Sequence, residues 1–288
     1  MKKAWLQMHL AIFLWGFAGI LGKAISMSEG MIVWYRLVIS AAGLLPLLLH
    51  NRIVLPSRKE ILKITFVGAV VALHWVTFYG AIKASNVSIA LGCFSSISLF
   101  TAILDPLSRY KRPKTSEILL GISVIIGLLV IFSVRKVYLA GILLAVISAF
   151  LGAAFTVMNK HLTERHSPEV ITFYELTSGF LVLSALLPLY FSVTGTGFQV
   201  PKEWDIVYLL LLSLVCTSFA FTISLRALKK LDAFTLNLTL NLEPLYSIIL
   251  AIIIFHEYEV LNGGFIAGTL IILGSVMVHT WMRQRTKS

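Results

Sequence analysis

The sequence predicts an all-α integral membrane protein with ten transmembrane helices, arranged as two inverted five-helix repeats. The first observation is composition: 58% of the residues are hydrophobic and 13% are charged, whereas soluble chains carry about 25% charged residues. The second is a series of long apolar stretches, and the third is an internal repeat. Ten helices of about 20 residues would use about 200 residues. Little of the 288-residue chain then remains outside the bilayer, which excludes a water-soluble enzyme.

The apolar stretches are separated by short polar clusters. Lipid offers the backbone no hydrogen-bond partners, so a spanning segment must be a helix or a strand of a closed barrel. Runs of about 20 residues are too long for barrel strands. The predicted spans, in chain order, are Met8–Ala24, Met31–Leu49, Ile64–Ile82, Ser88–Ser108, Glu117–Val134, Leu139–Met158, Val170–Phe191, Ile206–Leu225, Ala233–Phe255 and Leu261–Trp281.

The distribution of lysine and arginine predicts the orientation of these spans. With the N-terminus inside, the inner connections and tails hold 18 basic residues and the outer connections hold 5. Positive charge accumulates on the cytoplasmic side of membrane proteins. We therefore expect a multi-pass protein of the plasma membrane (the inner membrane of a bacterial cell) with both termini in the cytoplasm. The net charge of +11 is then an orientation signal and not a sign of nucleic-acid binding.

The two halves of the chain can be aligned, which predicts a first repeat over residues 1–136 and a second over residues 137–288. A unit of five spans starts its second copy on the opposite side of the membrane, so the copies have inverted topology. Secondary transporters have this architecture, with a substrate site near midplane between the repeats. The matched segments are Trp15-Gly16-Phe17-Ala18 with Leu151-Gly152-Ala153-Ala154, Tyr35-Arg36-Leu37 with Tyr174-Glu175-Leu176, Leu44-Leu45-Pro46 with Leu186-Leu187-Pro188, Ala81-Ile82-Lys83 with Ala227-Leu228-Lys229, and Gly121 and Gly127 with Gly268 and Gly274.

Several short motifs give the chain a family resemblance. They are Leu14-Trp15-Gly16 in the first span, Trp34-Tyr35-Arg36 in the second, and Glu243-Pro244-Leu245 followed by Phe255-His256-Glu257 in the ninth. With the glycine-spaced last span of each half, they resemble the EamA-type ten-helix permeases of the drug/metabolite transporter superfamily, which have two tandem EamA units. Two positions depart from the family pattern: the usual Gly-Glu reads His256-Glu257, and Lys111 replaces an acid in the first half.

The resemblance implies a secondary transporter of small metabolites, commonly an exporter of amino acids or related compounds. It also implies a central cavity formed by spans 1, 3, 4, 6, 8 and 9, with spans 5 and 10 at the periphery. The motifs do not specify the substrate.

The ninth span carries the first group of candidate substrate-binding residues. Glu243 lies near midplane, where an ionisable group is costly and usually faces a cavity. Pro244 removes a backbone donor and predicts a kink or a local opening of the helix. Asn237 and Asn241 lie four residues apart on one helix face. The alternative interpretation is an interhelical hydrogen-bond network.

The third span carries a second group. His74 lies at its centre, with Phe78 one turn on and Trp75 and Tyr79 on the adjoining face. An imidazole that titrates near neutral pH suits a proton carrier, and the aromatic rings suit the wall of a binding cavity. A histidine bonded to a neighbouring helix is the alternative. Trp15 of the first span is a further candidate for the cavity wall.

Three charged residues are predicted to have gating or structural roles. Arg36 and Glu175 occupy the same place in the two repeats but carry opposite charges. Inverted topology places Arg36 in the outer half of the membrane and Glu175 in the inner half, so they should not pair. Lys160 is the expected partner of Glu175. Arg36 either meets a substrate carboxylate or ties helix ends together.

The absence of certain motifs argues against other function classes, such as enzymes and channels. It has no GxxxxGK[ST] loop for ATP and no complete HExxH zinc motif, so we expect no cofactor, no metal site and no enzymatic activity. A lipid or lipid-linked-sugar flippase on the same scaffold is the alternative function, and no filter motif suggests a channel.

Expected partners are a small-molecule substrate, the lipid bilayer and, as a candidate coupled ion, a proton carried by Glu243 or His74. Gly264 and Gly268 form a GxxxG motif, which predicts close helix packing; the alternative is that the motif supports a homo-oligomer.

Overall fold

A computed structural model describes residues 1–50, 56–85, 87–132, 138–246 and 263–285, and every regular element in these ranges is helical. The predicted all-helical class is therefore confirmed. The boundary predicted at residues 136 and 137 lies outside the described residues and stays a prediction, as does the Phe255-His256-Glu257 motif. The helices are α1 (Lys2–Ala24), α2 (Glu29–His50), α3 (Arg58–Ala84), α4 (Val87–Phe94), α5 (Ile97–Ser108), α6 (Thr115–Phe132), α7 (Leu139–Leu162), α8 (Pro168–Thr194), α9 (Trp204–Leu210), η1 (Leu211–Phe219), α10 (Ala220–Leu228), α11 (Ala233–Leu240) and α13 (Gly263–Arg285).

The helices have the lengths and compositions that a bilayer requires. Among the described residues, seven helical segments of 20 to 27 residues are long and apolar enough to cross a membrane, and Thr115–Val130 and Ile266–Met282 are shorter apolar helices. Large apolar side chains such as Leu62, Leu181 and Met277 point outward. In a soluble protein such a surface would be unstable, whereas in lipid it is the expected exterior.

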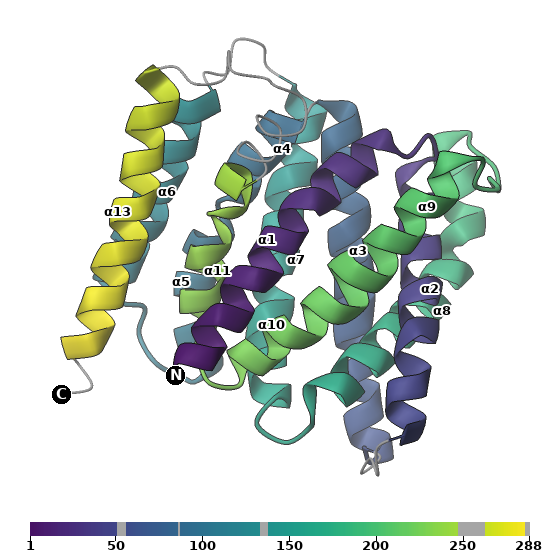
Figure 1. The fold of residues 1–288 in the computed structure, drawn as a ribbon, viewed down its shortest axis with the longest axis horizontal. Coiled ribbons are helices and arrows are strands. Elements are labelled where there is room, and N and C mark those ends of the chain that lie inside the picture. Colours follow the sequence, from purple (N-terminus) through teal and green to yellow (C-terminus); the bar gives the residue numbers. More distant parts are fainter. Residues whose placement is uncertain (51–55, 86, 133–137, 247–262, 286–288) are drawn as a thin grey trace.

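The packing of the helices follows the internal repeat (Figure 1). The last helices of the two repeats, α6 and α13, pack together at one side of the bundle, and α2 packs against α8 at the other side. Between them, α3 packs on α7 while α1 packs on α10 and η1. Each central helix thus contacts the other half, as an inverted pair of five-helix units requires. Both chain termini lie at one end of the bundle, which we call the termini face.

Two predicted spans are broken rather than continuous. The fourth span divides into α4 and α5 at Ser95 and Ser96. In the ninth span α11 ends at Leu240, residues 241 and 242 form a turn, and residues 243–246 are helical again; its later residues lie outside the described ranges. At the first break, two serine hydroxyls satisfy carbonyls of the preceding turn: Ser95 Oγ donates to Gly92 O at 2.6 Å and Ser96 Oγ to Cys93 O at 2.8 Å. Because serine is small and only weakly polar, the hydropathy of the segment does not reveal this break.

The eighth predicted span also departs from a regular α-helix. Its middle part, η1, is a π-helix between α9 and α10. Two hydroxyls in it donate to carbonyls five residues earlier: Thr217 Oγ1 to Leu212 O at 2.7 Å and Ser218 Oγ to Ser213 O at 3.1 Å. Single π-turns inside helices are rare and are frequent at functional sites.

Glycines permit the closest helix contacts. Gly68 of α3 and Gly179 of α8 face each other, and a Cβ on Gly179 would lie 2.8 Å from Gly68 O. A Cβ on Gly68 would overlap the Glu175 carbonyl and the Ser178 hydroxyl. On the opposite side of the bundle, a Cβ on Gly127 would lie 3.0 Å from Gly268 O, so Gly268 serves packing between α6 and α13 within the chain. Small residues at helix contacts are the usual basis of packing in membranes.

Replacing Gly68 with alanine should therefore destabilise the bundle. The new methyl group meets backbone atoms of α8 that cannot move independently, and overpacking of this kind costs about 1–3 kcal/mol. We expect Gly68→Ala to lower the thermal midpoint of the purified protein in detergent.

Gly274→Ala is the matched control, since a Cβ there meets nothing within 4 Å and alanine favours the helix by about 1 kcal/mol. Equal midpoints for the two variants would contradict the packing described for α3 and α8.

Candidate functional site

A cavity lies between the two halves of the bundle. It is narrow: the space that the centre of a water molecule can occupy is about 80 Å³. The expected spans 1, 3, 4, 6, 8 and 9 all contribute to its wall, and α2 contributes as well, through Arg36. The lining residues are Trp15, Ala18, Arg36, His74, Trp75, Phe78, Tyr79, Phe94, Ile97, Phe155, Thr156, Asn159, Phe221, Ser224, Leu228, Leu236, Asn237, Leu240 and Glu243.

The structure brings seven of the eight predicted substrate-binding residues to this one cavity. Asn241 is the exception, because its side-chain amide donates to Asn237 O at 3.1 Å and Leu238 O at 3.2 Å in its own helix. It thereby satisfies carbonyls at the end of α11. The seven that line the cavity are Trp15, His74, Trp75, Phe78, Tyr79, Asn237 and Glu243.

Both broken spans meet the cavity at equivalent positions of the repeat. An offset of 146 residues, which relates Ala81 to Ala227, places the break at Ser95 on the break at Asn241. The same offset relates the cavity residues Phe94 and Leu240, and also Ile97 and Glu243. Discontinuous helices at the repeat interface are a feature of substrate sites in transporters.

Arg36 is held in the cavity wall by three contacts. Its guanidinium carbon lies 3.8 Å from the centroid of the Trp75 ring. Its Nε donates to Thr217 Oγ1 at 2.7 Å, and its Nη1 donates to the Tyr79 hydroxyl at 3.0 Å. Only 3% of Arg36 is exposed. The sequence predicted a gating or structural role for Arg36, and the structure places it on the cavity wall.

His74 is fixed to the neighbouring helix α7. Its Nδ1 lies 2.9 Å from both the carbonyl and the hydroxyl oxygen of Ser148, and the Ser148 hydroxyl donates to His74 O at 3.0 Å. These contacts are those of a structural histidine, although the ring also faces the cavity beside Phe155. The proton-carrying role considered for His74 and Glu243 stays a prediction.

Asn237 joins three helices. Its amide nitrogen donates to Thr101 Oγ1 of α5 at 2.8 Å, and its amide oxygen lies 3.4 Å from Thr156 Oγ1 of α7. The interhelical network considered from the sequence is therefore present at Asn237, on the wall of the cavity.

The expected pairing of Lys160 with Glu175 is wrong. Lys160 Nζ donates to Leu228 O at 2.8 Å, at the end of α10. The buried Glu175 carboxyl instead accepts a hydrogen bond from Asn159 Nδ2 at 3.2 Å. Asn159 and Lys160 are consecutive in α7 and so point about 100° apart around the helix: Asn159 meets Glu175, whereas Lys160 points to the end of α10, where the Leu228 carbonyl accepts from its ammonium group.

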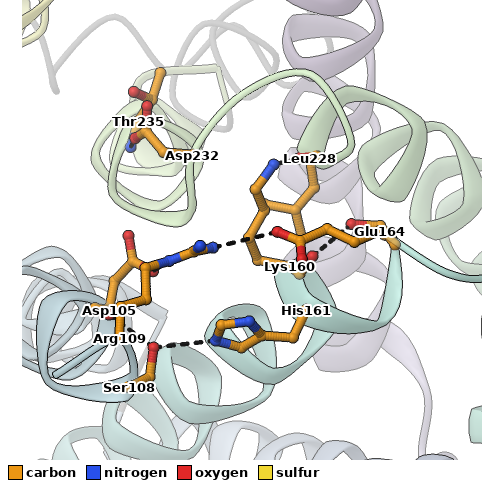
Figure 2. Close-up of polar contacts among 10 residues, drawn as sticks. Asp105, Ser108, Arg109, Lys160, His161, Glu164, Leu228, Asp232 and Thr235 are labelled. Atoms are coloured by element: carbon orange, nitrogen blue, oxygen red, sulfur yellow. Dashed lines mark hydrogen bonds and ion pairs between the residues drawn. The ribbon is translucent and has the colours of Figure 1, made fainter.

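At the termini face, polar contacts join the two halves (Figure 2). Arg109, at the end of α5, lies with Nη2 3.5 Å from Glu164 Oε1, which follows α7. The Ser108 hydroxyl lies 3.1 Å from His161 Nε2 of α7. Glu60 of α3 and His166 form another link, with 3.3 Å between Oε1 and Nε2.

At the opposite face, other polar contacts join the halves. Asp205 accepts hydrogen bonds from Ser26 N at 3.0 Å and Ser26 Oγ at 2.6 Å. Gln199 Oε1 accepts from Ser28 N at 2.6 Å. Polar contacts therefore join the two halves at both faces of the bundle.

Sequence reasoning did not predict several cavity residues, but the repeat contains a signal for some of them. The 146-residue offset relates Trp75 to Phe221 and Phe78 to Ser224, and all four line the cavity. Applying the offset to the predicted aromatic group would have identified both partners. Phe155 follows no such rule and is found only from the structure. Within the described ranges, no group of three or more His, Cys, Asp or Glu residues could hold a metal ion.

Comparison with known proteins gives three findings. The sequence profile of the EamA-like transporter family matches residues 2–133 and 139–281, one match for each half. An uncharacterised transporter of Archaeoglobus fulgidus is 26% identical over 246 residues, which cover 78% of this chain and 79% of that protein. A solved crystal structure superposes with a TM-score of 0.77 over the whole of both chains at 17% identity, which shows the same fold.

The hydrogen bonds of the two asparagines predict different consequences of their removal. Asn237→Ala should lower stability by about 1–2 kcal/mol, because it takes an interhelical bond from Thr101 in a lipid environment. Asn241→Ala removes bonds only to its own helix and should cost less. Thermal unfolding of both variants in the same detergent tests this order; a larger loss for Asn241→Ala would contradict it.

Proposed function

The chain belongs to the EamA-like transporter family, and on this premise we propose that it carries a small metabolite through the central cavity by alternating access. The proposed direction is outward across the plasma membrane, and the proposed cargo is an amino acid or a related compound. The proposed substrate-binding residues are those predicted ones that line the cavity, with Asn241 in a supporting position at the end of α11.

The observation that carries this proposal is a largely aromatic cavity with a few polar and charged groups, which lies between two equivalent halves that separate contacts join at each face of the bundle. Arg109–Glu164 and Glu60–His166 join the halves at the termini face, while Asp205 joins them at the opposite face. Two near-equivalent halves can rock about the cavity, so that one set of contacts breaks while the other remains.

The energy of these contacts suits a reversible motion. Exposed ion pairs are worth about 0–1 kcal/mol each, and two conformations that exchange within a working cycle differ by only a few kcal/mol. Arg109, Glu164 and Glu60 are all partly exposed to solvent. Loss of one such pair would therefore change the population of an open state by a few-fold without unfolding the bundle.

The proposed orientation places the termini face in the cytoplasm. We expect a cysteine at Lys230 to react with a membrane-impermeant maleimide only from the cytoplasmic side, and a cysteine at Lys202 only from outside. Both variants are made in a Cys93→Ser, Cys216→Ala background, which removes the native thiols. Reaction of both positions from one side would contradict the proposed crossing of the membrane by the segment Trp204–Leu228 between them.

Alternating access is tested with a cysteine inside the cavity, at Ser224, in the same background. Arg109→Glu places like charges beside Glu164 and should raise maleimide labelling from the cytoplasmic side by about fivefold, the effect of 1 kcal/mol. Asp205→Asn weakens the contact to Ser26 and should raise labelling from the outer side instead.

The exchanged pair Arg109→Glu with Glu164→Arg is the matched control, because it restores opposite charges and should return labelling toward the starting rate. If each single variant raised labelling from both sides at once, the cavity would be a continuous path and alternating access would be rejected.

A further inference from the structure

Arg36 is a buried cation in the middle of a membrane protein. A guanidinium group in the bilayer interior costs several kcal/mol unless its surroundings compensate the charge. The described contacts compensate it only in part: the ring faces of Trp75 and Tyr79, one threonine hydroxyl and one phenol hydroxyl. None of these groups carries a negative charge.

No carboxylate of the described residues lies within 4 Å of the Arg36 guanidinium. Glu243 shares the cavity with Arg36 and interacts with it electrostatically, but over more than ion-pair distance. Glu175, the counterpart of Arg36 in the second repeat, bonds to Asn159. Within the described part of the chain, the positive charge of Arg36 thus faces the cavity without an ion pair.

The three contacts also fix which edge of the guanidinium remains available. Nε is bonded to Thr217 and Nη1 donates one hydrogen bond to Tyr79. The hydrogen bonds of the described residues include none from Nη2. The edge formed by Nη1 and Nη2 is the one that binds a carboxylate with two parallel hydrogen bonds.

The π-helix η1 holds this arrangement. The Thr217 hydroxyl donates its hydrogen to Leu212 O, so its lone pairs are left to accept from Arg36 Nε. The neighbouring Ser218 hydroxyl bonds to Ser40 O at 2.9 Å and so ties η1 to α2 one turn beyond Arg36. The guanidinium is therefore oriented before any ligand arrives.

We propose that Arg36 is the carboxylate-binding residue of the cavity, and that the cargo must carry a carboxylate group on an apolar or aromatic body. This inference rests on the proposed transport function and deepens it. The apolar body would lie against the aromatic part of the wall, where Trp15, Phe78, Phe155 and Phe221 line the cavity. Stacking on Trp75 fixes the plane of the guanidinium. Recognition would therefore depend on the planar geometry of its paired N–H donors and not on positive charge alone.

The test compares matched acids and carboxamides. Thermal shifts of the purified full chain in detergent are measured with phenylalanine, leucine and methionine, and with the carboxamide of each. At least one acid should raise the thermal midpoint, and its carboxamide should bind at least tenfold more weakly, because a charge-assisted pair is worth about 1.5–3 kcal/mol.

Variants assign the effect to Arg36. Arg36→Gln should abolish the shift, and Arg36→Lys should weaken binding at least tenfold because it keeps the charge without the fork. Glu175→Gln, at the equivalent place of the other repeat, is the control and should leave the shift unchanged. The wild-type comparison of acid with carboxamide keeps the test decisive if an Arg36 variant fails to fold.

Carboxamides that bind as tightly as their acids, or a panel in which no acid binds, would overturn the inference. Either result would leave the transport proposal standing if the cavity cysteine at position 224 still showed labelling from one side at a time. Labelling from both sides at once would reject transport by alternating access, whatever the acids do.

Discussion

The bilayer requires that the chain satisfy its own backbone hydrogen bonds, and the rest of the structure depends on this constraint. A helix break in lipid is tolerated only where side chains or a cavity take over the freed carbonyls. Ser95 and Ser96 do so at the end of α4, and the Asn241 amide does so at the end of α11. Both breaks lie at the same place in the repeat, and residues beside each of them line the cavity between the halves.

The same constraint explains what the sequence could and could not predict. The apolar runs and the repeat predict the helices, and an ionisable residue in such a run predicts a cavity; Glu243 and His74 were found in this way and line it. Breaks escape prediction when the residues that satisfy the carbonyls are small. Ser95 and Ser96 barely change the hydropathy of their segment, and only Pro244 signals the equivalent break in the second half.

Local helix geometry accounts for what was missed at Arg36 and Lys160. The side chain of Arg36 turns into the cavity because Thr217 in a π-helix and the Trp75 face receive it, and neither feature has a sequence signature. Lys160 was assigned to Glu175 from charge and proximity in sequence, but its ammonium group donates to the Leu228 carbonyl, and the Glu175 carboxyl accepts from Asn159. Charge predicts a partner poorly when a helix end competes for the cation.

The two halves share the same order of helices but carry different charged residues at equivalent positions. The shared helices would serve the conformational change, and the different charges would serve substrate recognition. Arg36 and Glu175 occupy equivalent positions, as do Ile97 and Glu243, yet Arg36 and Glu243 line the cavity while Glu175 is bonded to Asn159 beside it. Under the proposed mechanism, the shared backbone would allow the two conformations of similar energy that alternating access needs. A fully symmetric cavity would have to place its charges in pairs related by the pseudo-two-fold axis. Because this one does not, the proposed site would bind one end of a small molecule at Arg36 and present a different surface to the other end in both conformations.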